Sequence, residues 1–365
     1  MTFEFKYGVF NMLVHADVAE MTGDNKEWGP PVTMHLKRKL KEPPSFTKED
    51  VNFRNGNVHI TGTLVKPLTP GPHAAIVVIP GSGPQGRQTY HYRFWGEFFA
   101  RHEIIALIFD KRGVGGSSGN YEQAGFDDFA ADVLAAVQLL KTRKDIDRKH
   151  IGLFGISQGG WTARLAASRS KDITFLILNA GPAVTVEEQE LDRIQNTLQA
   201  NKFSEQDIAE ALAYARLEFD AAYTGKSLGE LQSAGKTARD KKWYEYVQYD
   251  NSEKELAGWR LTRFDPAPSL RKMSSPVLAI FGEQDPLVPP IHNADKMKQY
   301  LSEAGNKDVT IRIIAGADHS MEVRQILKGK KWEFPEKYWV WAKKPTIFYE
   351  TIINWLSAHL GSAQE

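Results

Sequence analysis

The chain has 365 residues, of which 42% are hydrophobic and 25% charged, values that are ordinary for a soluble globular protein and exclude global disorder. Its length allows one large core with an insertion or appendage. The 46 lysines and arginines balance 45 acidic residues, so no long-range field favours nucleic acid, anionic lipid or a polyanion. We expect any substrate to be small and weakly charged, while the oligomeric state stays open.

Two features of the sequence bear on the cellular compartment of the protein: its cysteine content and its apolar segments. There is no cysteine, which excludes disulfides, thiolate nucleophiles and cysteine metal sites together. Residues 1–20 lack a basic segment followed by an apolar run, and no stretch reaches the roughly 18 apolar residues needed to span a bilayer. We therefore expect a soluble protein that is cytoplasmic, or secreted or periplasmic if a signal peptide was removed.

The first segment, residues 1–50, mixes aromatic side chains with prolines and shows no strong period, so we expect an irregular N-terminal extension. Residues 51–67 then place Asn55-Gly56 between two alternating apolar runs. Both of these residues tolerate positive φ, which is the requirement of a two-residue hairpin turn. This segment predicts an antiparallel hairpin at a sheet edge.

From there, short runs that are apolar on both faces alternate with helical stretches such as 126–141. Such runs are typical of parallel strands covered by helices on both faces. They predict a doubly wound, mostly parallel α/β sheet whose core spans 51–183 and 263–365. The predicted strands are 74–79, 104–109, 151–156, 173–178, 276–281 and 309–314.

The alternation is interrupted at residues 184–262, where the sequence is charged and helical. We interpret this segment as an inserted helical cap. Ligands bind at the carboxyl ends of the strands in open α/β sheets, and an insertion there would roof the site. A helical decoration without substrate contact is the alternative.

Gly155-Ile156-Ser157-Gln158-Gly159 lies between a predicted strand and a helix through Trp161. A serine on such a sharp turn needs small neighbours, because the strained backbone brings the flanking residues close together. The pattern predicts that Ser157 is a nucleophile. A serine hydroxyl is a poor nucleophile at neutral pH, so a base and an orienting acid must follow, in the order serine, acid, histidine.

The base is predicted to be His319, which follows the strand at 309–314 as that order requires. His292 is the nearest rival but belongs to a predicted helix after Pro290, and His91 and His102 flank an earlier helix.

Three carboxylates are candidates for the acid that orients the histidine. Glu283 and Asp285 both follow the strand at 276–281, and Asp318 adjoins the base in sequence. Adjacent side chains on extended backbone point to opposite sides, which disfavours Asp318.

An acyl-transfer site also needs donors for the oxyanion, usually the N–H after the nucleophile and one from an earlier loop. Gln158 follows the nucleophile. The loop Pro80-Gly81-Ser82-Gly83 follows the first buried strand and is rich in glycine, so we predict Ser82 as the second donor, with Gly83 as the near alternative. A plain strand-to-helix turn is the alternative reading of that loop.

Together these motifs resemble the α/β-hydrolase superfamily, and within it bacterial serine esterases with a GSGP oxyanion loop and a GxSQGG nucleophile elbow. The resemblance covers roughly 50–362 and includes FDKRGVGGSSG at 109–119, which is similar to a DxRGxGxS loop. It implies that Asp110 and Arg112 shape this loop without being catalytic. Pro80 stands where histidine is often found, unlike lipases whose loop begins HGG.

The resemblance also implies the chemistry. Its spacing favours Asp285 as the acid that orients His319. Ser157 would attack the acyl carbon, His319 would pass its proton to the leaving group, and water would hydrolyse the acyl-enzyme. Neither a metal nor an organic cofactor is required.

Aromatic residues are frequent in two segments, the predicted cap and KKWEFPEKYWVWAKKP at 330–345. Those of the cap are Phe203, Tyr214, Phe219, Tyr223, Trp243, Tyr244, Tyr246, Tyr249 and Trp259. If they line the site, they favour an aryl-bearing ester; if they pack at helical spacing, they form core. A thioesterase, a prolyl-oligopeptidase-type peptidase and a non-enzymatic ligand receptor on the same scaffold are the other readings.

Overall fold

The computed structural model describes residues 2–5, 8–14, 18–24, 32–37, 45–247, 249, 251–326 and 340–361; the segments before residue 45, and 324–326 and 340–343, are described by backbone alone. The chain divides into two units, Met1–Pro44 with Gln325–Trp341, and Ser45–Arg324 with Ala342–Glu365. The candidate site lies entirely in the second unit.

The N-terminal unit contains an antiparallel sheet of four strands in the order β1-β2-β3-β4. The expectation of an irregular segment over 1–50 is therefore wrong for these strands. Short strands give weak periodic signals; the clearest is Val32–Lys37, in which apolar and polar residues alternate. The bounds are β1 Thr2–Phe5, β2 Gly8–Val14, β3 Val18–Asp24 and β4 Val32–Lys37.

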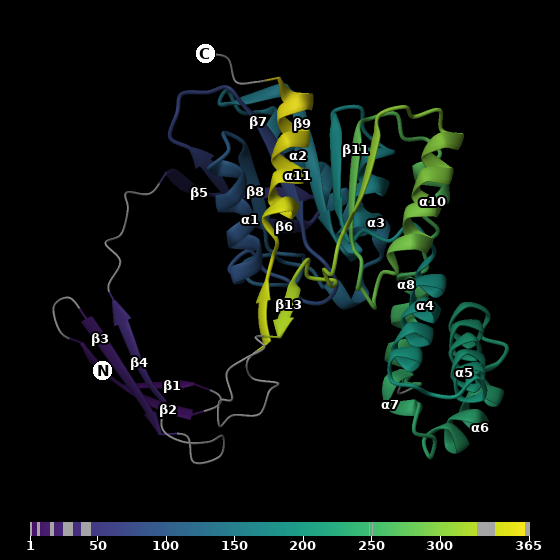
Figure 1. Cartoon of the computed structure of the whole chain (residues 1–365). Coiled ribbons are helices and arrows are strands. Elements are labelled where there is room, and N and C mark those ends of the chain that lie inside the picture. The colour runs from purple at the N-terminus through teal and green to yellow at the C-terminus, as the bar shows by residue number, and fades with distance from the viewer. Residues whose placement is uncertain are drawn as a thin grey trace. The chain divides into compact units, whose positions relative to one another are not determined.

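The larger unit is built on an eight-stranded sheet in the order β12-β11-β10-β9-β7-β8-β6-β5 (Figure 1). Neighbours from β12 to β8 are parallel, and β6 and β5 add antiparallel strands at one edge. The predicted α/β class is confirmed. The bounds are β5 Phe46–Asn55, β6 Val58–Pro67, β7 His73–Ile79, β8 Ile105–Phe109, β9 Ile146–Ile156, β10 Phe175–Asn179, β11 Val277–Gly282 and β12 Val309–Ile314.

The predicted hairpin is the β5–β6 pair at the sheet edge, closed by Asn55 opposite Val58 with Gly56 at φ 55°. Because β5 begins at Phe46, the sheet starts before residue 51, the predicted limit of the core.

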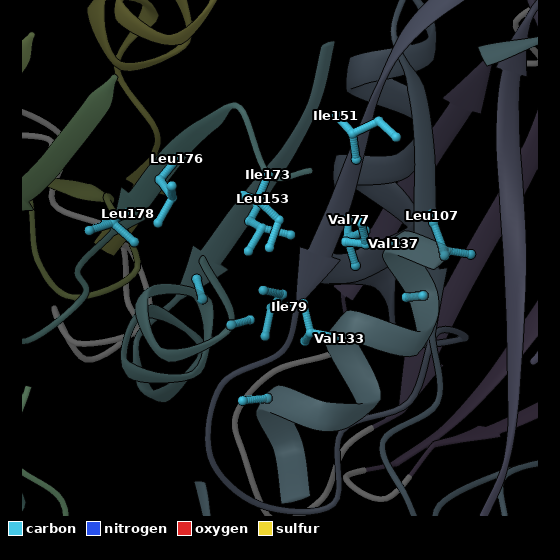
Figure 2. Packing of buried hydrophobic residues seen from close by; sticks show 14 of the residues in the cluster. Val77, Ile79, Leu107, Val133, Val137, Ile151, Leu153, Ile173, Leu176 and Leu178 are labelled. Atoms are coloured by element: carbon cyan, nitrogen blue, oxygen red, sulfur yellow. The ribbon is translucent and has the colours of Figure 1, made fainter. Parts of the chain in front are cut away.

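Buried residues cover both faces of the sheet, as the continuous apolar runs require. Along β7, Val77 and Ile79 belong to one hydrophobic cluster, and Ile76 and Val78 belong to the other. The first cluster includes residues of α2, α3 and α10, and the second includes residues of α1 and α11; Figure 2 shows part of the first. The bounds are α1 Tyr90–Ala100, α2 Phe126–Lys141, α3 Gln158–Ala167, α10 Pro290–Glu303 and α11 Thr346–Leu360.

Between β10 and β11 the chain forms a group of helices, α4 to α8, that we call the helical insertion (Figure 1). Capping boxes at Thr185 and Ser204 begin its first two helices, and a left-handed Gly225 ends the second. The backbone N–H of Val186 donates to the carbonyl oxygen of Phe264 at 3.3 Å, so the two ends of the insertion meet. The bounds are α4 Val186–Ala200, α5 Glu205–Thr224, α6 Leu228–Ala238, α7 Tyr244–Val247 and α8 Glu253–Leu261.

Four shorter elements complete the described chain: the 3-10 turn η1 Tyr121–Gln123, the helix α9 Ala267–Leu270, and the paired strands β13 Val323–Ile326 and β14 Val340–Lys343. No helix among the described residues is long and apolar enough to cross a membrane.

Candidate active site

Ser157 occupies the sharp turn between β9 and α3. Its backbone lies at φ 52° and ψ −119°, a left-handed conformation that is unfavourable for residues with a Cβ atom. A Cβ atom on Gly155 would lie 2.5 Å from the carbonyl oxygen of Gly159, and one on Gly159 would lie 2.4 Å from that of Ile79. The turn that presents the serine therefore depends on glycine at both positions.

The structure brings Ser157, His319 and Asp285 together in one hydrogen-bonded chain. His319 Nδ1 lies 2.8 Å from Asp285 Oδ2, and its Nε2 lies 3.1 Å from Ser157 Oγ. With the carboxylate accepting from Nδ1–H, Nε2 is left to accept the proton of the serine hydroxyl. This tautomer is the one a general base requires.

Asp285 is fixed by its loop as well as by the histidine. Its other oxygen, Oδ1, accepts from the backbone N–H groups of Leu287 and Val288 at 2.8 and 2.9 Å. The carboxylate is fully buried, whereas the ring of His319 is 23% exposed. A buried carboxylate with several donors stays ordered, and it holds the imidazole in one orientation.

The rival acids have other partners. Glu283 accepts from the N–H of Gly316 at 2.8 Å, and Asp318 accepts from the N–H of Ser320 at 2.9 Å and of Glu322 at 3.0 Å. Both carboxylates thus stabilise the turn that carries the histidine.

The rival histidines are also placed elsewhere. His292 Nδ1 lies 2.8 Å from Asp192 Oδ2 on α4, and His102 Nδ1 lies 2.8 Å from the carbonyl oxygen of Phe98. Burial lowers the pKa of His91, on α1, to about 4.

The loop after β7 passes directly beside the serine turn. A Cβ atom on Gly81 would lie 3.4 Å from the carbonyl oxygen of Ile156 and 3.7 Å from Ser157 Cβ. The N–H of Gly81 donates to the Tyr92 hydroxyl at 3.0 Å, which ties the loop to α1, and Gly83 adopts φ 78°. Ser82 lies between these two glycines, and Gln158 is the first residue of α3. The two predicted oxyanion donors thus belong to segments that meet at Ser157.

The loop after β8 contains three charged residues with different surroundings. Asp110 accepts from the N–H of Arg87 at 2.8 Å and from that of Gly116 at 3.0 Å. Arg112 Nε donates to Asp132 Oδ2 at 2.7 Å. Both residues therefore stabilise the loop.

Lys111, between them, was not anticipated from the sequence. It is 5% exposed, and its Nζ donates to Gln158 Oε1 at 2.7 Å and to the carbonyl oxygen of Gly81 at 3.1 Å. Burial lowers the pKa of this lysine to about 8. The available signal was its position just after a buried strand, since such positions face the ligand site of an open sheet.

Next to the serine turn is a cavity of about 500 Å³. Gly83, Lys111, Phe129 and Gln158 contribute from the core, and the rest of the lining comes from 121–124 and from α8 and its flanks. These remaining residues are Tyr121, Glu122, Ala124, Ser252, Lys254, Glu255, Gly258, Trp259, Leu261 and Thr262. A volume of this size is in the range of small-molecule sites.

Aromatic residues of the helical insertion pack within it, and one of them, Trp259, also lines the cavity beside the serine turn. Tyr214, Phe219, Trp243 and Tyr249 are buried, and most of them form the insertion's own hydrophobic core. Packing within the insertion therefore accounts for these four. The aromatic side chains of 330–345 lie outside the described residues.

Within the part of the chain that the structure describes, no group of three or more His, Cys, Asp or Glu side chains could hold a metal ion.

Known proteins share this architecture. Residues 75–321 match a family model described as the alpha/beta hydrolase fold. Serine hydrolase BPHL of Mus musculus is 26% identical over 254 residues, which are 70% of this chain and 75% of the relative. Esterase EstD of Thermotoga maritima is 25% identical over 289 residues, 77% of this chain, and the match spans 61% of that esterase, less than two thirds of its length.

Solved structures agree on the fold. The Pyrococcus furiosus esterase Pf2001 superposes with a TM-score of 0.55 at 19% identity, over 88% of this chain and 96% of the esterase. Est1E from Butyrivibrio proteoclasticus, whose structure holds ferulic acid, superposes with a TM-score of 0.52 at 17% identity, over 86% of this chain and 100% of Est1E. The extent of the family match shows that the chain belongs to the α/β-hydrolase fold family.

Proposed function

We propose that this protein cleaves carboxylic esters of small substrates through an acyl-enzyme formed on Ser157. The observation that carries the proposal is the hydrogen-bonded chain from Asp285 through His319 to Ser157, with distances of 2.8 and 3.1 Å. The serine stands on a strained turn, the next residue, Gln158, lines the cavity, and a base with the required tautomer lies within reach of the serine hydroxyl. This is the arrangement that activates a serine for attack on an acyl carbon.

In the proposed mechanism, Ser157 Oγ bonds to the ester carbon while His319 removes the proton of the serine hydroxyl. The N–H groups of Gln158 and Ser82 donate to the oxyanion that develops on the former carbonyl oxygen. His319 then gives its proton to the leaving alcohol as the C–O bond breaks, and Asp285 stabilises the imidazolium meanwhile. Attack by water, with His319 again as base, releases the acid and restores the serine.

The cavity supports an aryl-bearing ester as the substrate. Tyr121, Phe129 and Trp259 supply ring surface from the 3-10 turn, α2 and α8, and rings favour contact with flat apolar groups. An acyl or alcohol group of the cinnamoyl type would use this surface. In the proposal the helical insertion acts as the cap, because α8 forms one side of the cavity.

The first test is a substrate panel with wild type and Ser157→Ala. It contains p-nitrophenyl esters of rising acyl length, a naphthyl ester, a p-nitrophenyl cinnamate, an acyl thioester and an aminoacyl anilide. We expect ester turnover by wild type and a loss of about 10⁶ in kcat for the variant. Preferred cleavage of the thioester or the anilide would establish a thioesterase or a peptidase instead.

A fluorophosphonate probe provides a readout that does not depend on the choice of substrate, since it requires only an activated serine. We expect it to label wild type and not Ser157→Ala. A folded wild-type protein that turns over no ester and resists the probe would refute the proposal and favour a ligand receptor.

The aryl preference has its own test in Trp259→Ala and Tyr121→Ala. We expect each substitution to lower kcat/KM for p-nitrophenyl cinnamate by about 10-fold, a typical effect of lost apolar contact. The value of kcat/KM for p-nitrophenyl acetate, the shortest acyl ester of the panel, should change much less. Tyr90→Ala is the matched control, because this tyrosine is 75% exposed and is not among the residues lining the cavity. Equal effects on both esters would refute the aryl pocket.

A further inference from the structure

A buried lysine beside the proposed oxyanion loop has no role in the mechanism so far. Lys111 follows β8, and it is 5% exposed. Lysine is almost never fully buried unless its charge is paired, because taking an ammonium out of water is costly. The cost must be offset by the partners of this amine.

Those partners are neutral acceptors. Nζ of Lys111 donates to Gln158 Oε1 at 2.7 Å and to the carbonyl oxygens of Gly81 and Gly83 at 3.1 and 3.5 Å. It also lies 4.4 Å from the centre of the Phe129 ring, at a distance typical of a cation–π contact. The described contacts of Nζ thus include three oxygen acceptors, which match the three donors of an ammonium group, and no carboxylate.

The contact with Gly81 acts on the proposed oxyanion donor. The carbonyl of Gly81 and the N–H of Ser82 belong to one planar peptide group and point in opposite directions across it. A cation held at the oxygen therefore fixes the direction of the N–H. It also polarises the amide, which makes the N–H a stronger donor.

The contact with Gln158 acts on the other half of the proposed hole. Gln158 is the first residue of α3, and its own N–H is the second proposed donor. Because Lys111 holds this side chain and the 81–83 loop at the same time, one ammonium joins the segments that follow β9 and β7. The N–H of Gly81 also ties this loop to α1 through the Tyr92 hydroxyl, so Lys111 is the contact that adds a positive charge and a link to Gln158.

We infer that Lys111 is a positioning residue that holds both halves of the oxyanion hole in place and polarises the peptide that carries the Ser82 N–H. This inference rests on the proposed function. Lys111 also lines the cavity, so direct binding of a substrate carboxylate is the competing role. The existing contacts favour positioning, because a substrate carboxylate would have to replace acceptors that the protein already provides.

The two roles differ in the kinetics of Lys111→Met, which keeps the length of the side chain and removes its charge and donors. Positioning predicts a loss of about 10²–10³ in kcat for neutral esters with little change in KM, as when an oxyanion donor is removed. Binding of a trifluoromethyl ketone, which forms a tetrahedral adduct, should weaken in parallel. Lys111→Arg, which restores a cation and donors, should recover part of kcat.

Lys141→Met is the matched control. Lys141, on α2, forms an ion pair with Asp172 at 2.7 Å, and its described contacts do not include the catalytic residues or the oxyanion loop. We expect wild-type kinetics from it. A folded Lys111→Met enzyme with kcat within threefold of wild type would overturn the inference. A rise in KM confined to esters that carry a carboxylate, such as a hemisuccinate, would overturn it in favour of substrate binding.

The pH profile keeps the inference testable if Lys111→Met does not fold. Burial lowers the pKa of Lys111 to about 8, so kcat of wild type should fall as pH rises through this value, whereas Lys111→Arg should keep its activity there. The other charged groups at the cavity are Glu122 on the 3-10 turn, and Lys254 and Glu255 on α8; Asp132 on α2 lies beside Phe129. If kcat of wild type and of Lys111→Arg fell in the same way at alkaline pH, the positioning role of Lys111 would be refuted.

The proposed function and this inference fail in different ways. A wild-type protein that hydrolyses no ester refutes the function. An active wild type with an active Lys111→Met variant refutes the inference alone.

Discussion

The backbone strain at Ser157 leads to a prediction about stability. At φ 52° and ψ −119° the serine holds a conformation that costs about 1–3 kcal/mol for a residue with a Cβ atom. Glycine adopts it without that cost, but loses about 0.5–1 kcal/mol more backbone entropy on folding. Ser157→Gly should therefore be more stable than Ser157→Ala by about 0.5–2 kcal/mol.

The comparison of the two variants isolates the backbone. Both lack the hydroxyl and its 3.1 Å contact with His319, and Ser157 makes no side-chain cap for α3, so the loss of the hydroxyl affects both equally. Both should be inactive. Their free energies of unfolding are measured by urea titration followed by tryptophan fluorescence, with circular dichroism as a check on the native fold.

A Ser157→Gly variant that is no more stable than Ser157→Ala would refute the reasoning. It would mean that the turn stores no strain, and the left-handed geometry would then be relaxed in solution.

Three further predictions follow from individual contacts. Asp285→Asn should lower kcat by about 10⁴ while leaving the fold intact, because an amide that donates to His319 selects the wrong tautomer; ester kinetics and circular dichroism check this. Asp132→Ala should lower the free energy of unfolding in urea by about 1.5–3 kcal/mol, because the buried guanidinium of Arg112 loses its closest partner and keeps only Asp128. In wild type, kcat should fall as pH rises through about 8, since the protonated form of Lys111 is the active one and burial lowers its pKa to about 8; a pH–rate profile that stays flat to pH 10 would contradict this.

Sequence pattern predicted the sheet well because its signals are local. The run at 74–79 and the helix at 126–141 correspond to β7 and α2, and Asn55-Gly56 identified the edge hairpin. Each is decided by the apolar period or the turn chemistry of a few neighbouring residues. The N-terminal sheet was missed because strands of four to seven residues with mixed polar and apolar side chains carry a weak periodic signal.

The candidate site was predicted through chain order rather than through contacts. The structure places Ser157, Asp285 and His319 within hydrogen-bonding distance, and their catalytic roles remain predictions. Lys111 was missed because its partners, Gly81 and Gln158, are distant in sequence and become neighbours only when three strands pair. Burial of a lysine is a property of the fold and leaves no local pattern.

The meeting of the two ends of the helical insertion has a consequence for how this enzyme could change. The insertion begins at Val186 and ends near Phe264, two residues joined by a backbone hydrogen bond, and the helices between them have a hydrophobic core of their own. The chain therefore enters and leaves this segment at one place in the fold. Exchange of α4 to α8 for a different set of helices needs to match the host where Val186 meets Phe264, where Asp192 on α4 contacts His292, and along α8, where it lines the cavity. Under the proposed function, the segment that selects the substrate could thus change while Ser157, Asp285 and His319 stay in place.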